Sequence, residues 1–186
     1  MNFLTYEQGK RLVRIARNSV TSCFEGKIFS NDDFKEKKGV FVSIHSYSNL
    51  RLRGCIGFIE PIYGLSDAVI KAAKAAAFQD PRFKPIIEGD LNKIVFEVSV
   101  LTTPKPVTDI KKIKVGRDGL IVEKDNHKGL LLPQVAIQYN LNVVGFLEQT
   151  SIKAGLDKDG WKDAKVYMFQ AQIFKEIKPM GDIAEE

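Results

Sequence analysis

The segment LRLRGCIGF, at Leu50–Phe58, holds the residues whose types and spacing best suit chemistry. As a β-strand it alternates its side chains between two faces, so Arg51, Arg53, Cys55 and Gly57 share one face. A nearby cation stabilises a thiolate over a thiol and lowers the thiol pKa. The pattern therefore favours a reactive Cys55 beside an anion-binding Arg53. The alternative is that the arginines pair with surface carboxylates and Cys55 is a half-buried packing residue.

Two glycines flank this cysteine. Gly54 and Gly57 have no β-carbon, so a ligand or another stretch of backbone can approach closely at either position. We therefore include both glycines with Arg53 among the predicted ligand-binding residues.

Two residues are candidate proton carriers for Cys55. Glu97 interrupts the apolar strand sequence IVFEVSVL, where it either faces a cleft as an acid or base or lies on a solvated sheet face. His45 belongs to the preceding strand, where it is either the base of a Cys–His pair or a half-exposed residue with no chemical role. We predict Cys55 and Glu97 as the catalytic residues.

The sequence QDPRF places Asp80 and Arg82 in a loop stiffened by proline. Loops on a rigid scaffold often contact ligands, which makes both residues candidates for ligand binding. The alternative is a local Asp–Arg pair that only braces the loop.

The cysteines and histidines are scattered and lack the paired spacing of a zinc site, so we expect no bound metal. The sequence does not identify a cofactor. Cys23 falls on the apolar stripe of the first predicted helix and is expected to be a small buried residue.

The composition is that of an ordinary globular protein: 186 residues, 44% hydrophobic, 27% charged, with a net charge of +5. The apolar runs are shorter than the 18 or so residues of a membrane span, and the first residues lack a signal-peptide pattern. We therefore expect no membrane contact and a cytoplasmic location. The short basic clusters at 35–38 and 111–114 are compatible with a polyanionic ligand but equally with solvated surface.

Hydrophobic periodicity predicts helices and strands that interleave with few strand–helix–parallel-strand units. The class expected is α+β, with a largely antiparallel sheet flanked by helices. Residues 178–186 are expected to form a flexible tail. The predicted helices cover residues 5–26, 64–78 and 133–155, and the predicted strands cover 39–46, 50–59, 92–101 and 164–177, with a further hairpin turning at 126–129.

Several motifs, in order, resemble the AMMECR domain family. They are LRGCIG, DPRF, EVSVL, GRDGLIV, LLLPQVA and FLEQTSIKAGL, at residues 52–57, 80–83, 97–101, 116–122, 130–136 and 146–156. The resemblance covers nearly all of residues 1–186 and implies one compact domain, with two interleaved lobes and the LRGCIG motif at a groove between them.

The resemblance also implies partners and a class of function. Members of this family are associated with Memo-like and radical-SAM proteins, and a part in RNA or nucleotide modification is implied for an enzyme or enzyme component. The alternative is a non-catalytic module that binds nucleic acid, a small anionic metabolite or a protein segment in the same groove. The oligomeric state does not follow from the resemblance.

Overall fold

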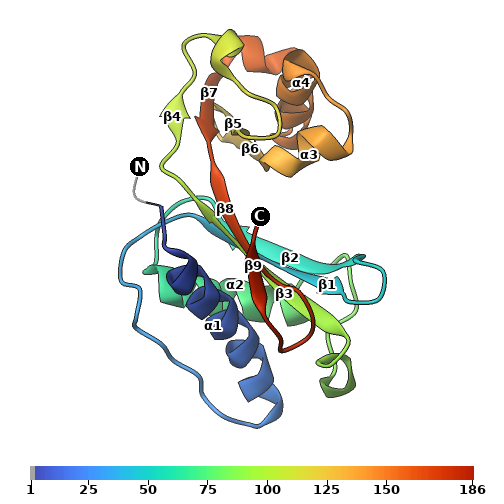
Figure 1. Cartoon of the computed structure of the whole chain (residues 1–186). Coiled ribbons are helices and arrows are strands. Elements are labelled where there is room, and N and C mark those ends of the chain that lie inside the picture. Colours follow the sequence, from blue (N-terminus) through green and yellow to red (C-terminus); the bar gives the residue numbers. More distant parts are fainter. Residues whose placement is uncertain (1–2) are drawn as a thin grey trace. The chain divides into compact units, whose positions relative to one another are not determined.

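A computed structural model describes residues 3–186 of the chain (Figure 1). The chain divides into two compact units, the first reaching Leu101 and resuming at Gln172–Glu186, the second spanning Thr102–Ala171. Both contain an antiparallel sheet and helices, so the α+β class is confirmed. Among residues 3–186, no helix has both the length and the apolar character to cross a bilayer.

The first unit is built on a five-stranded sheet. Strand β1 lies between β2 and β3 and pairs antiparallel with both, while β8 and β9 are contributed by the last residues of the chain. The strands are β1 (Val40–Ser46), β2 (Leu52–Phe58), β3 (Ile94–Leu101), β8 (Ala171–Glu176) and β9 (Ile183–Glu185), in the order β2-β1-β3-β8-β9.

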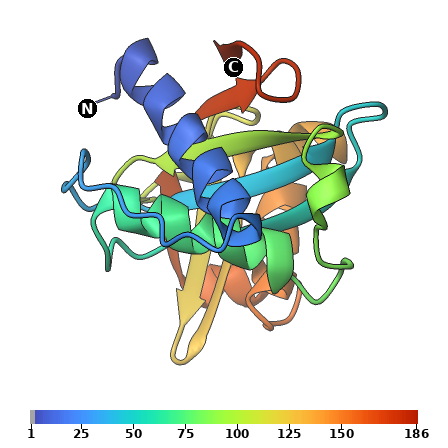
Figure 2. The ribbon, with the colours of Figure 1, turned by 90° about the horizontal axis from the view of Figure 1, so that it is seen from below.

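Two long helices pack on one face of this sheet (Figure 2). Helix α1 (Tyr6–Phe24) is capped by Thr5, which forms a capping box with Gln8. Helix α2 (Leu65–Phe78) presents buried alanines, whose small side chains allow the helix to approach the strands closely. The core between helices and sheet includes Leu12, Val13, Val20, Val40, Val42, Ile44, Leu65, Val69, Phe96 and Phe174.

A buried ion pair ties α1 to the C-terminal strand β8. The Arg17 guanidinium donates to both carboxylate oxygens of Glu176 and to the carbonyls of Leu91 and Ile94. Glu176 also accepts the backbone N–H of Phe96 at 2.9 Å. The network satisfies both charges inside the protein, as buried ions require.

The second unit has a four-stranded sheet in the order β4-β7-β5-β6, and α4 packs on β5 and β6. Buried Asp118 holds the turn before β5, because its carboxylate accepts from the backbone of Lys114 and from the Arg117 guanidinium. The elements are β4 (Lys105–Pro106), β5 (Gly119–Lys124), β6 (His127–Leu131), β7 (Lys165–Phe169), α3 (Pro133–Gln138) and α4 (Val143–Lys153). Short 3₁₀ helices lie at Glu88–Asp90, Ile110–Lys112 and Gly160–Asp163.

Two predicted elements are each divided. The helix predicted over 133–155 is two helices, because Asn140 has a positive φ and Asn142 caps a new N-terminus. The strand predicted over 164–177 is β7 and β8, which belong to different sheets.

Two further expectations differ from the structure. Residues 178–186, expected as a tail, include β9, which pairs antiparallel with β8. Cys23 is exposed, not buried, because in the last turns of α1 the buried face continues through Ser19 and Ser22.

Candidate active site on the first unit

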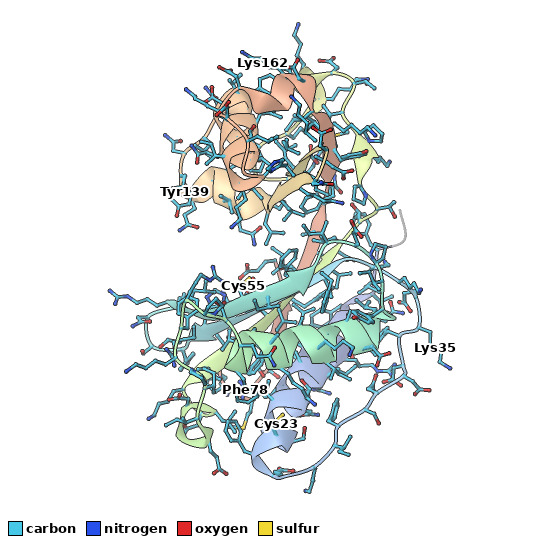
Figure 3. The ribbon with its side chains drawn as sticks, turned by 180° about the vertical axis from the view of Figure 1, so that it is seen from behind. Cys23, Lys35, Cys55, Phe78, Tyr139 and Lys162 are labelled. Carbon is cyan, nitrogen blue, oxygen red and sulfur yellow. The ribbon has the colours of Figure 1, made fainter. Side chains whose placement is uncertain are left out.

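Strand β2 presents Cys55 on the sheet face opposite the helices. Gly54 and Ile56 point toward the helices: Gly54 abuts α2 and Ile56 packs against the core. Cys55 points the other way, on the side of β2 away from α2 (Figure 3). The predicted alternation therefore holds from Gly54 to Gly57. It does not extend to Arg53, because a register shift in the β1–β2 pair places Leu52, not Arg53, opposite His45.

Ser43 connects Cys55 to Glu97 across three strands. It lies directly opposite Cys55 in the β1–β2 pair and directly opposite Glu97 in the β1–β3 pair, so all three side chains share one face. The Ser43 hydroxyl donates to the Cys55 sulfur at 3.3 Å. We call Cys55, Ser43 and Glu97 the polar row.

The Cys55 thiol is not activated in the expected way. Burial raises its pKa, and this effect exceeds the opposing effects of the Ser43 hydrogen bond and the Arg82 charge. The predicted cation, Arg53, has its guanidinium 3.8 Å from the Asp90 carboxylate. The arginine that acts on the thiol electrostatically is thus Arg82, and the thiol form of Cys55 is favoured.

Glu97 is a buried carboxyl group, 8% exposed. Burial raises its pKa, the charges of His45 and Lys175 oppose the shift, and that of Glu186 reinforces it. The His45 Nε2 atom lies 3.7 Å from the Glu97 carboxylate. His45 is therefore placed beside Glu97, on the strand next to β2, and the structure records no contact between His45 and the Cys55 sulfur among the described residues.

Asp80 and Arg82 grip the peptide of Cys55. Asp80 accepts the Cys55 backbone N–H at 2.9 Å, and Arg82 donates to the Cys55 carbonyl at 3.0 Å. The two side chains also pair with each other, Arg82 Nη2 lying 2.6 Å from Asp80 Oδ2. These hydrogen bonds hold the Asp80 pKa well below its usual range. We call Asp80 and Arg82 the edge clamp, because β2 is the outermost strand of its sheet.

The two glycines of the motif have different neighbours. A β-carbon at Gly54 would overlap the backbone carbonyl of Ala76 in α2, so that space belongs to the helix and not to a ligand. A β-carbon at Gly57 would overlap the ring of Phe41, which lies across the strand on the same face as Cys55.

Comparison with known proteins identifies the family. The AMMECR1 family model matches residues 13–174. This chain belongs to the AMMECR1 family. Protein MJ0810 of Methanocaldococcus jannaschii is 42% identical over 100% of this chain and 98% of its own, and Protein PF1979 of Pyrococcus furiosus is 47% identical over 95% and 92%. The crystal structure of the uncharacterized protein PH0010 from Pyrococcus horikoshii superimposes with a TM-score of 0.91 at 44% identity, covering 98% of both chains.

The residues predicted from the sequence did not include Ser43 or Phe41 of the candidate site. Ser43 and Phe41 both lie on β1, on the face that Cys55 and Glu97 share. Their alternation within VFVSIHS was the available signal, since it puts Phe41, Ser43 and His45 on one side of the strand.

Among residues 3–186 of this AMMECR1 chain, no group of three or more His, Cys, Asp and Glu side chains is arranged to hold a metal ion. The chemistry available in the polar row itself is proton transfer by a thiol, a hydroxyl and a carboxyl group.

Proposed function

We propose that this AMMECR1-family chain is an enzyme, or the catalytic component of an enzyme system, that modifies a nucleotide or an RNA base at the polar row. The observation that carries the proposal is the alignment of Cys55, Ser43 and Glu97 across three neighbouring strands. A raised carboxyl pKa keeps an acid closer to its neutral form near neutral pH, which is the property of a general acid.

The roles within the row follow from its geometry. Glu97 is the proton carrier, and Cys55 is the group that meets the substrate, because its side chain is partly exposed while Glu97 is buried. Ser43 stabilises the thiolate when it forms, because its hydroxyl donates to the sulfur. Asp80 and Arg82 are positioning residues that fix the Cys55 backbone.

Genetic complementation tests this proposal. In a host that lacks its own AMMECR1-family gene, RNA and nucleotide pools would be analysed by mass spectrometry for modified nucleosides, with and without the wild-type chain. Cys55→Ser and Glu97→Gln should each abolish the change that the wild type restores, and Cys23→Ser should not. Full restoration by Cys55→Ser would refute a chemical role for the thiol.

The second candidate is a non-catalytic binding module, and one observation favours it. Burial keeps Cys55 in its thiol form, so the motif is also suited to a shape role. For this function, Cys55→Ser would retain complementation while variants that block ligand binding lose it.

The setting of the proposed activity is the cytoplasm, with Memo-like and radical-SAM proteins as candidate partners. Affinity purification of the tagged chain from its own cells should recover these proteins at near-stoichiometric amounts. Their absence from salt-resistant and cross-linked eluates alike would remove them as direct partners.

A further inference from the structure

Phe41 is an aromatic residue on the polar face of the first sheet. It is partly exposed, and neither hydrophobic cluster among residues 3–186 includes it. Its neighbours in β1, Val40 and Val42, point into the core, as alternation requires. The ring therefore lies apart from the apolar core, on the face that carries Cys55.

The backbone beneath the ring is shaped to hold it. Gly57 lies directly opposite Phe41 in the β1–β2 pair, and any β-carbon at this position would overlap the ring. Because Gly57 has no side chain, the Phe41 ring can lie over β2 at this position, two residues along the strand from Cys55. A ring held in this way is a ready stacking surface, because its position is fixed before a ligand arrives.

Unpaired polar atoms lie near the ring. Ser99 lies opposite Phe41 in the β1–β3 pair, and its hydroxyl is buried with no hydrogen-bond partner among the described residues. The residue is only 1% exposed. The His45 Nε2 atom, on the far side of the polar row, is likewise buried without a hydrogen bond. Buried polar groups normally form hydrogen bonds. His45 Nε2 has the Glu97 carboxylate 3.7 Å away, so the Ser99 hydroxyl is the group that can accept a ligand as its partner.

We infer that Phe41, Ser99 and the polar row form a binding site for a single unpaired nucleobase. The base stacks on the Phe41 ring, and its hydrogen-bonding edge meets Cys55, Ser43 and the Ser99 hydroxyl. An antiparallel sheet with helices on one face and an aromatic side chain on the other is a recurrent platform for unpaired bases. The inference rests on the proposed function and names its substrate class.

The charges around Cys55 suit the phosphate of such a ligand. The Arg82 guanidinium bonds the Cys55 carbonyl and the Asp80 carboxylate, yet its side chain remains 55% exposed. Arg53 lies at the register shift of β2 and pairs with Asp90, so it is not counted here. Arg82 is thus the partly exposed guanidinium next to Cys55, and guanidinium groups bind phosphate well.

Calorimetric titration tests the inference with two kinds of ligand, the four nucleoside 5′-monophosphates and single-stranded RNA ten-mers. Ribose 5-phosphate, which has no base, is the control ligand. Tighter binding of the mononucleotides would indicate a free nucleotide as the source of the base, and tighter binding of the ten-mers would indicate RNA.

Substitutions of Phe41 test whether its ring stacks on the base. Phe41→Leu should weaken nucleotide or RNA affinity by roughly 5- to 150-fold, the range expected for loss of one stacked base. Phe41→Tyr should bind like the wild type, and Tyr63→Leu, which removes an exposed aromatic ring elsewhere in this unit, should have no effect. Ser99→Ala should change the preference among the four bases. Thermal unfolding of each variant identifies any loss that comes from misfolding.

The outcomes separate this inference from the proposed function. Equal affinity for nucleotides and ribose 5-phosphate, no detectable binding of any base-containing ligand, or an unchanged affinity in folded Phe41→Leu would overturn the stacking site. A modification that still depends on Cys55 in that case would leave the proposed function standing. Conversely, Phe41-dependent binding together with full activity of Cys55→Ser would support the base site and refute the catalytic role.

Discussion

The carboxylate of Asp80 accepts the backbone N–H of Cys55 at 2.9 Å, so a loop residue occupies the position that a further strand would take beside β2. Arg82 completes the arrangement at the carbonyl of the same residue. The DPRF and LRGCIG motifs therefore form one structural unit. An edge strand with open N–H and C=O groups invites pairing with other chains, and the edge clamp occupies both groups of Cys55.

Asp80→Asn should lower stability in a pH-dependent way. The folded-state pKa of Asp80 lies below its unfolded value of about 4, so the stabilisation is complete above about pH 5 and is lost as the pH falls through the folded pKa. Near neutral pH the variant should lose about 1–3 kcal/mol of unfolding free energy, measured by urea denaturation.

In the same experiment, the difference between wild type and Asp80→Asn should shrink below pH 4. Asp32→Asn is the matched control, because the Asp32 side chain is 90% exposed. A difference between wild type and Asp80→Asn that stays constant from pH 7 to pH 3 would contradict the ionic contribution of Asp80.

The pH dependence of Cys55 alkylation should report a thiol pKa above the ordinary value of about 8.5, because burial disfavours the thiolate. The measurement uses a Cys23→Ser background, so that one thiol reacts. Ser43→Ala should raise the Cys55 pKa further by removing a donor to the sulfur, and Glu97→Gln should lower it by removing a negative charge.

Ser43→Thr, which retains the hydroxyl, and Ser46→Ala, at the end of β1, are the controls for this titration. A Cys55 pKa well below 8.5 in the parent protein would show that the arginines, not burial, dominate the site.

Alanine substitution at the two glycines of the LRGCIG motif should lower stability more than the same substitution at a surface glycine. Gly54→Ala places a methyl group against the backbone carbonyl of Ala76, which cannot move without shifting α2. We expect a loss of about 3 kcal/mol or more, at the upper end of overpacking effects, measured by thermal or chemical unfolding. Gly57→Ala meets the Phe41 ring and the Val40 carbonyl and should also destabilise.

Gly89→Ala is the control for these variants, because a β-carbon there meets no atom within 4 Å. Wild-type stability in Gly54→Ala would mean that α2 does not rest against β2 at this point.

Arg17→Ala should be among the most damaging substitutions in the chain. It leaves the Glu176 carboxylate, 3% exposed, without its cation, and the loss expected from breaking a buried pair is about 3–5 kcal/mol. Arg14→Ala, on the exposed side of the same helix, should change the free energy of unfolding by less than about 0.5 kcal/mol. Similar small effects of both variants in urea denaturation would contradict the structural role of the ion pair.

Local patterns in the sequence predicted much of the fold. The alternation from Gly54 to Gly57 depends on neighbours a few residues apart, and it is present in the structure. Glu97 does share the face of Cys55, but it is buried there and does not lie on a solvated face. The local Asp–Arg pair considered for QDPRF is present, but it does more than brace the loop, because both residues also bond the Cys55 backbone.

Local patterns could not predict the contacts between residues that are far apart in the sequence. The cation predicted for Cys55 was Arg53, two residues away, whereas Arg82 comes to Cys55 from a loop 27 residues along the chain. Ser43 contacts Cys55 only because the β1–β2 register places them opposite each other, and periodicity gives faces but not register. The exposure of Cys23 depends on where α1 ends relative to its neighbours, which its own apolar stripe does not specify.

The division of the first unit around Thr102–Ala171 has a consequence for synthesis on the ribosome. The second unit is continuous in sequence, whereas β3 can pair with β8 only after residues 102–171 have been synthesised. Arg17 is separated from Glu176 by 159 positions in the sequence, so its charge lacks this partner until Glu176 has been synthesised. Contacts this distant in sequence form slowly, and partly formed sheets expose edges that aggregate. The first unit is thus most prone to aggregation while residues 102–171 are being synthesised, before β8 closes its sheet.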